Sequence, residues 1–179
     1  GGGVTFSGGE PLNQAGFVQA VLERCRYFGI GTAIETSLHA DYSLIAPLLP
    51  LLDLIYVDLK AMDAARHREL AGVDNALILD NIRRLDAALI APRLILRMPV
   101  IPGLNDDAAN LRLTGEFCAG LRHLRCLELL PYHRLGVATY ARLGREYALP
   151  EVKTPDRGQM QSAADIIRAS APELKLSVR

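Results

Sequence analysis

The sequence predicts an α/β fold in which parallel strands alternate with helices, and three observations support this prediction. Short runs rich in β-branched and other apolar residues alternate with longer stretches in which apolar residues recur three or four positions apart. Repeated βα units imply parallel strands joined by right-handed crossovers. Polar or glycine-rich residues follow one expected strand after another, as they do where the carboxyl ends of parallel strands form a binding rim.

The expected strands are the β-rich runs at residues 4–6, 32–35, 54–59, 94–100, 124–130 and 174–178. Helices are expected at residues 13–28, 41–51, 64–71, 76–89, 107–120 and 155–170, because each stretch places apolar residues on one helical face. This alternation fits either a doubly wound open sheet or part of a β/α barrel. Six strands are too few for the closed eight-stranded barrel.

The 179 residues suit a single domain, and no linker or low-complexity stretch divides residues 1–179, although residues 135–157 form a long connection. The 20 basic and 20 acidic side chains cancel, so no nucleic-acid or anionic membrane partner is indicated. The apolar stretches are interrupted well short of the roughly 18 residues that a membrane helix needs, and no signal-peptide pattern is present. We therefore expect no membrane partner and a cytoplasmic location.

The three cysteines are Cys25, Cys118 and Cys126, which lie too far apart in sequence for a local metal motif. Their odd number argues against a disulfide framework. Cys25 shares an apolar helical face with Phe17 and Leu22, and we interpret all three cysteines as small core residues.

Polar segments follow the first five expected strands. In chain order they are Ser7-Gly8-Gly9-Glu10-Pro11, Glu35-Thr36, Asp58-Leu59-Lys60, Arg97 with residues 102–106, and Pro131-Tyr132-His133. Because the loops beyond the carboxyl ends converge on one face, we expect a shared site there. Adjacent glycines let a ligand approach the main chain and offer their peptide groups to a carboxylate or ammonium. The alternative is a tight turn in which Glu10 and Pro11 begin the next helix.

Opposite charges share one face of this expected rim. Asp58 and Lys60 stand two apart on a strand, so they project to the same side as Tyr56. Arg97 and Glu128 interrupt apolar strands and must be paired or ligand-bound if they point inward, because an isolated buried charge costs several kcal/mol. A structural ion pair is one reading. A ligand with both an amine and a carboxylate, such as an amino-acid moiety, is the other.

The four histidines differ in position. His133 ends the fifth strand on the shared rim, and we expect it to contact a ligand, the alternative being a solvated bystander. His39, His67 and His123 lie in helices or loops without a partner pattern, and we expect them at the surface.

The motifs resemble a known family. Residues 3–12, Gly-Val-Thr-Phe-Ser-Gly-Gly-Glu-Pro-Leu, are similar to the Gly-Gly-Glu segment of radical S-adenosylmethionine (SAM) enzymes, with flanks like those of the glycyl-radical-enzyme activating enzymes. Residues 56–60, residues 97–106 and the Leu129–Gly136 segment resemble, in order and spacing, later segments of the pyruvate formate-lyase activating enzymes. The resemblance covers nearly the whole chain.

The resemblance implies a partial TIM barrel that holds SAM on a [4Fe-4S] cluster and forms a 5'-deoxyadenosyl radical, an oxidoreductase chemistry that removes a hydrogen atom from a glycine of the partner glycyl radical enzyme. It implies no catalytic side chain. The implied SAM contacts are Gly8, Gly9, Glu10, Glu35, Thr36, Asp58, Leu59, Lys60, Arg97 and His133. It further implies a monovalent cation at Glu35, Thr36, Asp58 and the carbonyl of Tyr56, and a flavodoxin or ferredoxin as electron donor in anaerobic metabolism.

Two departures from the family accompany the resemblance. The second strand ends in Glu35-Thr36-Ser37-Leu38, where the family has Asp-Thr-Asn-Gly. The iron-sulfur motif C-x3-C-x2-C is absent, and closely held thiolates are what a cluster requires. We therefore expect the chain to be a radical SAM domain without its first βα unit, to be inactive alone, and to use the exposed edge of residues 4–6 for pairing or dimer contacts.

Two other functions are weighed against the activating enzyme. Lys60 at the carboxyl end of a strand, beside carboxylates, could form a Schiff base in a barrel lyase or aldolase. A non-catalytic interaction module is the remaining alternative.

Overall fold

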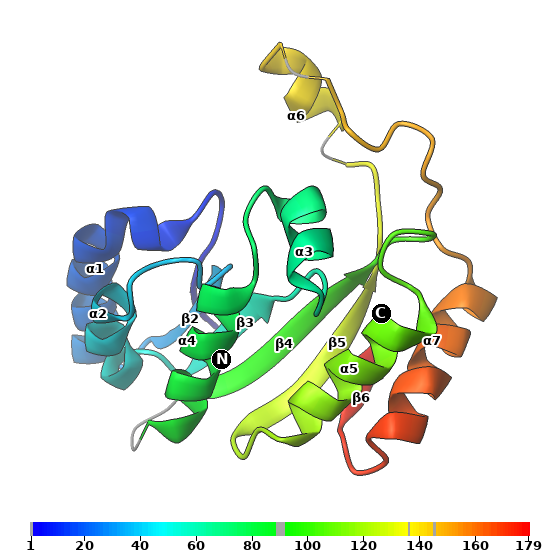
Figure 1. Ribbon diagram of the computed structural model, residues 1–179. Helices are drawn as coiled ribbons and strands as arrows, with labels where there is room; N and C mark the ends of the chain where they lie inside the picture. Colours follow the sequence, from blue (N-terminus) through cyan, green and yellow to red (C-terminus); the bar gives the residue numbers. More distant parts are fainter. Residues whose placement is uncertain (1, 89–91, 136, 145) are drawn as a thin grey trace.

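The computed structural model describes residues 2–88, 92–135, 137–144 and 146–179 and shows one six-stranded sheet (Figure 1). Every neighbouring pair of strands is parallel, and the strand order is β1-β2-β3-β4-β5-β6. The strands are β1 (Gly3–Phe6), β2 (Gly31–Thr36), β3 (Leu54–Asp58), β4 (Arg93–Val100), β5 (Leu124–Pro131) and β6 (Leu176–Val178). All six expected strands are confirmed, and the sheet is open, as expected for a partial barrel.

The helices agree with the expected ranges except where proline intervenes. They are η1 (Pro11–Gln14), α1 (Ala15–Tyr27), α2 (Tyr42–Ile45), η2 (Ala46–Leu51), α3 (Ala64–Ala71), α4 (Ala76–Ala87), α5 (Ala108–Ala119), α6 (Val137–Arg142) and α7 (Arg157–Ser170). Pro11 opens a 3-10 turn before α1, and the second expected helix continues after α2 as a 3-10 stretch that contains Pro50. Helix α6 lies in the stretch expected to be only a connection. Three predicted positions, Gly1, the helix end at Leu89 and Gly136, lie outside the described residues.

Aspartate side chains begin four of the described helices. The carboxylates of Asp41, Asp63, Asp107 and Asp156 each accept a hydrogen bond from a backbone N–H in the first turn that follows. These bonds satisfy donors that a helix leaves without intrahelical partners. These four helices therefore begin directly after a capping aspartate in the sequence.

The two faces of the sheet differ in character. Residues alternating along the strands, such as Ile34, Val57, Leu96 and Leu127, are at most 1% exposed and form the core with the helices. In Figure 1, α1, α2, α4, α5 and α7 lie on this side of the sheet, as right-handed crossovers between sequential strands require. The opposite face carries the partly exposed polar side chains, so the candidate site belongs to that face and to its rim.

Two expectations about burial are wrong. His67 is 1% exposed, because the chain after α3 folds back over its ring. The carbonyl oxygen of Val73 in this segment lies 2.8 Å from His67 Nδ1. Phe17 is 64% exposed, although it was expected on the buried face of α1 with Leu22. His39 and His123 are exposed as expected.

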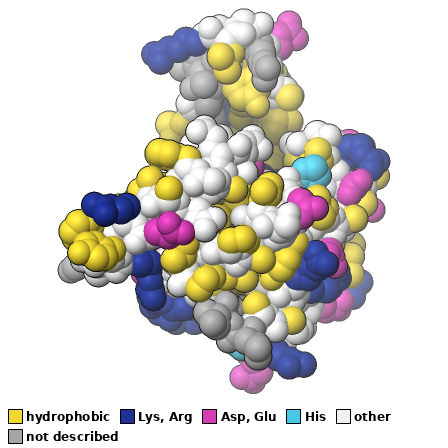
Figure 2. Space-filling model, turned by 90° about the vertical axis from the view of Figure 1, so that its left-hand side faces the viewer, with side chains coloured by type: hydrophobic (Ala, Val, Ile, Leu, Met, Phe, Trp, Pro, Cys, Tyr) yellow, Lys and Arg dark blue, Asp and Glu magenta, His cyan; other side chains and the backbone are white. Residues whose placement is uncertain are grey.

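The outer surface over α1 and α2 faces the viewer in Figure 2, where hydrophobic side chains gather at one edge. Tyr27 and Phe28 at the end of α1 are 78% and 61% exposed, and the guanidinium of Arg24 lies over both rings. Among the described residues, the helices are all too short or too polar to span a membrane. β1 has β2 as its neighbour in the described sheet, so its other edge is the one expected to pair, and that expectation stays a prediction.

Candidate functional site

The carboxyl ends of β2, β3 and β4 bring four charged side chains together. The register places Asp58 of β3 beside Arg97 of β4, and Arg97 beside Glu128 of β5. Arg97 Nε donates to Asp58 Oδ1 at 3.0 Å, and its Nη1 lies 3.2 Å from Glu35 Oε1. Lys60 Nζ donates to the other carboxylate oxygen of Asp58, also at 3.0 Å. The expected shared face of opposite charges is therefore present.

Arg97 is the centre of this charge network. Its side chain is 17% exposed, and its guanidinium lies 5.0 Å from the centroid of the Tyr56 ring. Burial on its own lowers the pKa of Arg97, but the carboxylates of Asp58 and Glu35 outweigh burial and raise the pKa above its usual value. Arg97 is therefore a permanent cation held between two carboxylates.

Glu128 and Arg179 form a second ion pair beside the first. Glu128 is 6% exposed, and Arg179 Nη2 donates to its Oε1 at 2.7 Å. This hydrogen bond and the charge of Glu128 raise the pKa of Arg179. The expectation that inward charges must be paired is met for both Arg97 and Glu128.

Glu10 joins the loop after β1 to the loop after β2. Its carboxylate accepts hydrogen bonds from Thr36 Oγ1 at 2.7 Å, Ser37 N at 2.9 Å, Ser37 Oγ at 2.6 Å and Leu12 N at 3.1 Å. Both oxygens are engaged. The bond from Leu12 N confirms the alternative reading in which Glu10 and Pro11 begin the next helix, whereas the bonds to Thr36 and Ser37 were not indicated by the sequence. Ser7 Oγ donates to Glu35 Oε2 at 2.9 Å and makes a second link between these loops.

The glycine pair leaves its main chain open. Gly8 has φ of 118°, a conformation that favours glycine, and a Cβ at Gly8 or Gly9 would meet no atom within 4 Å. The peptide groups beside Glu10 are thus accessible from the rim. This geometry fits the expected ligand approach and does not require the glycines for packing.

Two cavities meet at Asp58 and Lys60. One of about 520 Å³ extends past Pro99 and Leu130 to Tyr132 and His133, and Tyr140 and Tyr147 also line it. The other, of about 320 Å³, extends toward Glu10, Ser37 and the buried His67. Lys60 therefore lines both cavities.

Three tyrosines line the larger cavity. The hydroxyls of Tyr132 and Tyr147 lie 2.6 Å apart, and Tyr140 packs edge-on against Tyr147. Burial, followed by the hydrogen bond with Tyr147, raises the pKa of Tyr132 to about 12. The Tyr132 hydroxyl therefore stays neutral at physiological pH, and its hydrogen bond with Tyr147 ties the chain after α6 to the end of β5.

The remaining expected site residues lie as follows. His133 is exposed and lines the larger cavity. Leu59 is 1% exposed and its N–H donates to the carbonyl of Arg97 at 2.9 Å, so its expected contact with SAM stays a prediction. Thr36 is buried, and its hydroxyl donates to Glu10 rather than toward Asp58. The guanidinium of Arg97 lies between Glu35 and Asp58, two of the four residues of the expected cation site, which stays a prediction.

The cysteines do not form a cluster site. Cys25, Cys118 and Cys126 are free and buried. Among the residues that the structure describes, no group of three or more His, Cys, Asp or Glu side chains could hold a metal ion. The cysteines of this chain therefore do not fit a [4Fe-4S] cluster, in agreement with their interpretation as core residues.

We expect these three thiols to resist alkylation in the folded protein. Burial raises the pKa of Cys118 to about 12, and burial followed by the charge of Glu128 raises that of Cys126. Since the thiolate is the reactive form, iodoacetamide at about pH 8 should modify none of the three before unfolding and all of them in guanidinium chloride. Mass spectrometry after digestion measures each site, and rapid native labelling of Cys118 would contradict the prediction.

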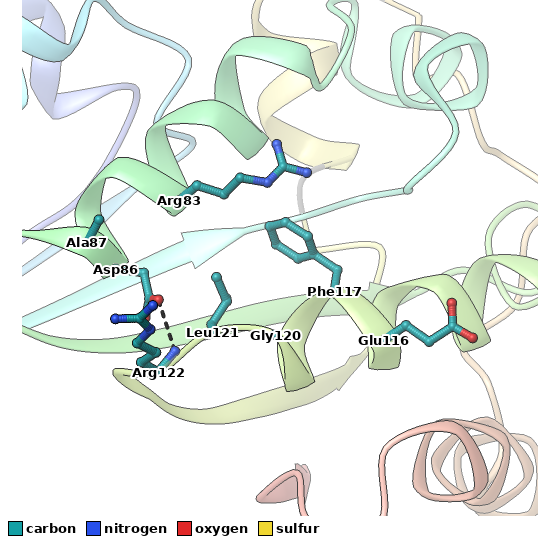
Figure 3. A pocket seen from close by; sticks show the side chains of 8 residues that line it. All are labelled: Arg83, Asp86, Ala87, Glu116, Phe117, Gly120, Leu121 and Arg122. Carbon is teal, nitrogen blue, oxygen red and sulfur yellow. Dashed lines mark hydrogen bonds between the residues drawn. The ribbon is translucent and has the colours of Figure 1, made fainter.

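A third pocket lies at the other end of the strands. It is formed by the carboxyl-terminal ends of α4 and α5, with Arg83, Glu116 and Phe117 on its walls (Figure 3). Its buried carboxylate, Asp86, already accepts from the backbone N–H groups of Arg122 and His123 at 2.9 and 2.7 Å. This arrangement secures the turn before β5, and the pocket is remote from the charged rim.

Sequence reasoning included Asn105 in the segment after the fourth strand, but it missed the role of Asn105 and missed the other three buried asparagines beneath the rim altogether. Asn75, Asn81, Asn105 and Asn110 are each at most 8% exposed and bond to main-chain groups of the loops after β2, β3 and β4. The available signal was an amide side chain at a helix start or on an apolar helical face, where a polar group needs a partner. No sequence pattern indicated that Tyr147 would line the larger cavity and bond to Tyr132.

The amino-terminal part of the chain matches a known protein family. The profile described as the Radical SAM superfamily matches residues 1–112, which is more than half of the chain. The chain therefore belongs to the radical SAM superfamily. The family uses SAM and a [4Fe-4S] cluster, and the mixture of Lys60, Arg97 and open glycine peptide groups suits the amino-acid end of SAM.

Its relatives are activating enzymes. The chain is 39% identical over 168 residues to the indoleacetate decarboxylase activating enzyme of Tractidigestivibacter scatoligenes, covering 94% of this chain and 53% of the relative. It is 41% identical over 165 residues to the 4-hydroxyphenylacetate decarboxylase activating enzyme of Clostridioides difficile, with 92% and 52% covered. The chain thus spans about half the length of these curated relatives.

A solved structure matches over its full length. The crystal structure of a domain of pyruvate-formate lyase-activating enzyme from Bacteroides vulgatus has a TM-score of 0.82 and 35% sequence identity. The match covers 100% of this chain and 99% of that one. The open six-stranded fold is therefore one that an activating-enzyme domain adopts.

Proposed function

We propose that the protein carrying this chain activates a glycyl radical enzyme, and that this chain supplies the cradle for SAM. The observation that carries the proposal is the rim itself, where open peptide groups at Gly8 and Gly9 lie on the same edge as the cations Lys60 and Arg97. Relatives at about 40% identity are activating enzymes of decarboxylases, which supports the same activity here. SAM and a [4Fe-4S] cluster, when bound in the whole protein, would supply the radical chemistry that removes a hydrogen atom from a glycine of the partner, and the cysteines of this chain would not hold that cluster.

The residues of this chain bind and orient rather than react. Main-chain groups of Gly8 and Gly9 would bind the amino group of SAM, and Lys60 its carboxylate. Arg97 still has N–H groups beyond those that contact Asp58 and Glu35, since a guanidinium carries five donors. His133, on the wall of the larger cavity, would contact the nucleoside. The apolar and tyrosine-lined walls would exclude water from a reactive radical.

The same proposal includes a flavodoxin or ferredoxin as electron donor, a cytoplasmic location and one radical SAM domain over residues 1–179. The described strands all join one sheet, which supports the single domain. The partner is a glycyl radical enzyme of a decarboxylase or lyase class, in keeping with the proteins that the relatives activate.

The Schiff-base lyase is not supported. A Schiff-base lysine must present a neutral amine, whereas Lys60 Nζ is 3.0 Å from the carboxylate of Asp58 in an ion pair. The relatives found are activating enzymes, and none of those named is an aldolase.

The proposal is tested on the full-length protein, reconstituted anaerobically with iron and sulfide. With dithionite it should convert SAM to 5'-deoxyadenosine, and a glycyl radical signal should appear in a candidate partner by electron paramagnetic resonance. Lys60→Ala should raise the Kd for SAM about tenfold, because one charge-assisted bond of about 1.4 kcal/mol is lost. Lys153→Ala, at an exposed position, is the matched control. Absence of nucleoside product under strong reduction would overturn the assignment.

A further inference from the structure

The loop that follows β3 is held by side-chain amides instead of neighbouring strands. The last backbone bond to β4 is from Leu59 N to the carbonyl of Arg97 at 2.9 Å, and beyond it the carbonyls of Lys60, Ala61 and Met62 and the N–H of Met62 all have partners. Every one of these partners is the amide group of a buried asparagine. Lys60 therefore projects from a segment whose main chain is fixed from beneath.

Asn105 makes the decisive contact. It is 0% exposed, and its Nδ2 donates to the carbonyl oxygens of Lys60 and Pro99, both at 2.7 Å. Its Oδ1 accepts from Ile101 N at 2.7 Å. One amide thus joins the end of β3 to the end of β4 and satisfies three main-chain groups.

Two further asparagines extend the same support. Asn110 Oδ1 accepts from Met62 N at 2.8 Å, and its Nδ2 donates to the carbonyl of Asn105 at 2.7 Å. Asn75 Nδ2 donates to the carbonyls of Ala61 and Met62 at 2.9 and 2.7 Å. Asn75 lies just before α4, and Asn105 and Asn110 lie around the start of α5. All three bond to the main chain of residues 60–62.

We propose that Asn105 is a positioning residue for Lys60, holding its main chain so that the ammonium stands between the two cavities where the carboxylate of SAM is bound. The inference rests on the proposed function, because it presumes that Lys60 binds SAM. Asn105 does not contact the ligand. It acts through its hydrogen bond to the Lys60 carbonyl. If the backbone of Lys60 shifts, the ammonium group is misplaced even though its charge is unchanged.

A matched pair of variants separates positioning from simple stabilisation. Asn81 is also 0% exposed, and its Nδ2 donates to two loop carbonyls, those of Leu38 and Ala40, at 2.9 and 2.8 Å. Asn105→Asp and Asn81→Asp are isosteric, and each removes two amide donors from a rim loop. Both should lower the thermal midpoint by several degrees. Only Asn105→Asp removes a hydrogen bond to the main chain of Lys60, so only this variant should displace the Lys60 side chain.

The experiment uses the full-length protein reconstituted with iron and sulfide, and measures SAM affinity by equilibrium dialysis on folded protein. Asn105→Asp should raise the Kd for SAM about fivefold, as expected for loss of one well-placed bond, and Asn81→Asp less than about twofold. In a Lys60→Ala background, Asn105→Asp should add less than about twofold, because residues that act through one another are not additive.

Each outcome decides one claim. Equal effects of Asn105→Asp and Asn81→Asp, or full additivity with Lys60→Ala, would overturn the positioning role and leave the proposed function standing. Failure of the unchanged protein to bind SAM would overturn the proposed function and this inference with it. If Asn105→Asp does not fold, Asn75→Ala removes the bonds to Ala61 and Met62 and must show the same dependence on Lys60.

Discussion

Replacing Arg97 by methionine is expected to lower the free energy of unfolding by about 2 to 4 kcal/mol. Methionine keeps much of the length of the side chain but removes the cation that contacts Glu35 and Asp58 together. Two partly buried carboxylates would then face one another across an uncharged side chain. Removing one partner of a buried pair costs more than the pair contributes, because the remaining charge stays desolvated.

Chemical denaturation of both proteins measures this loss. The control is Arg84→Met, which breaks an exposed pair with Asp80 at 3.6 Å and should change stability by less than about 0.5 kcal/mol. Neutralising the carboxylates in the same protein, with Glu35→Gln and Asp58→Asn, should recover about half of the deficit. Equal losses for Arg97→Met and Arg84→Met would contradict the role of Arg97 as the cation of the rim.

Replacing Glu10 by alanine should cost about 2 to 3 kcal/mol of stability. The substitution leaves four donors without their acceptor, from Leu12, Thr36 and Ser37, and unties the loops after β1 and β2. Glu10→Gln should be intermediate, because an amide NH2 in place of one oxygen would face the N–H of Ser37. The Ser37 hydroxyl can turn to accept, whereas its backbone N–H cannot.

Denaturation and hydrogen exchange together measure the effect of Glu10. Exchange at the Ser37 amide should become markedly faster in Glu10→Ala. Glu23→Ala is the matched control, since Glu23 lies on an exposed helix surface and accepts a bond from Gln19 Nε2 at 3.0 Å. It should change stability by less than about 0.5 kcal/mol. Unchanged exchange at Ser37 in Glu10→Ala would show that the two loops do not depend on this carboxylate.

The sequence predicted the sheet well because its signals are local. Each strand is a β-rich run and four of the described helices begin at an aspartate cap, so their ends lie within a few residues of the expected ranges. Helix α6 was missed because its described side chains give no periodic apolar signal, and Tyr140 within it and Leu143 just after it are 41% and 64% exposed. Its presence depends on contacts that fix the chain after β5.

The site was predicted in part for the same reason. The two-residue period of a strand places Tyr56, Asp58 and Lys60 on one face without knowledge of any neighbour. The partner of Arg97 depends on the register between β3 and β4, which sequence does not display. His67 was placed at the surface because its partner, the carbonyl of Val73, is a main-chain atom that approaches only after the chain turns back.

The strand order also bears on how the chain is made. Each strand pairs with the one synthesised just before it, so no strand must wait for a distant segment to leave the ribosome. A nascent chain can add one βα unit at a time to a growing template, and every loop closure spans a single unit. We expect protection from proteases to advance from the amino-terminal strands as translation proceeds.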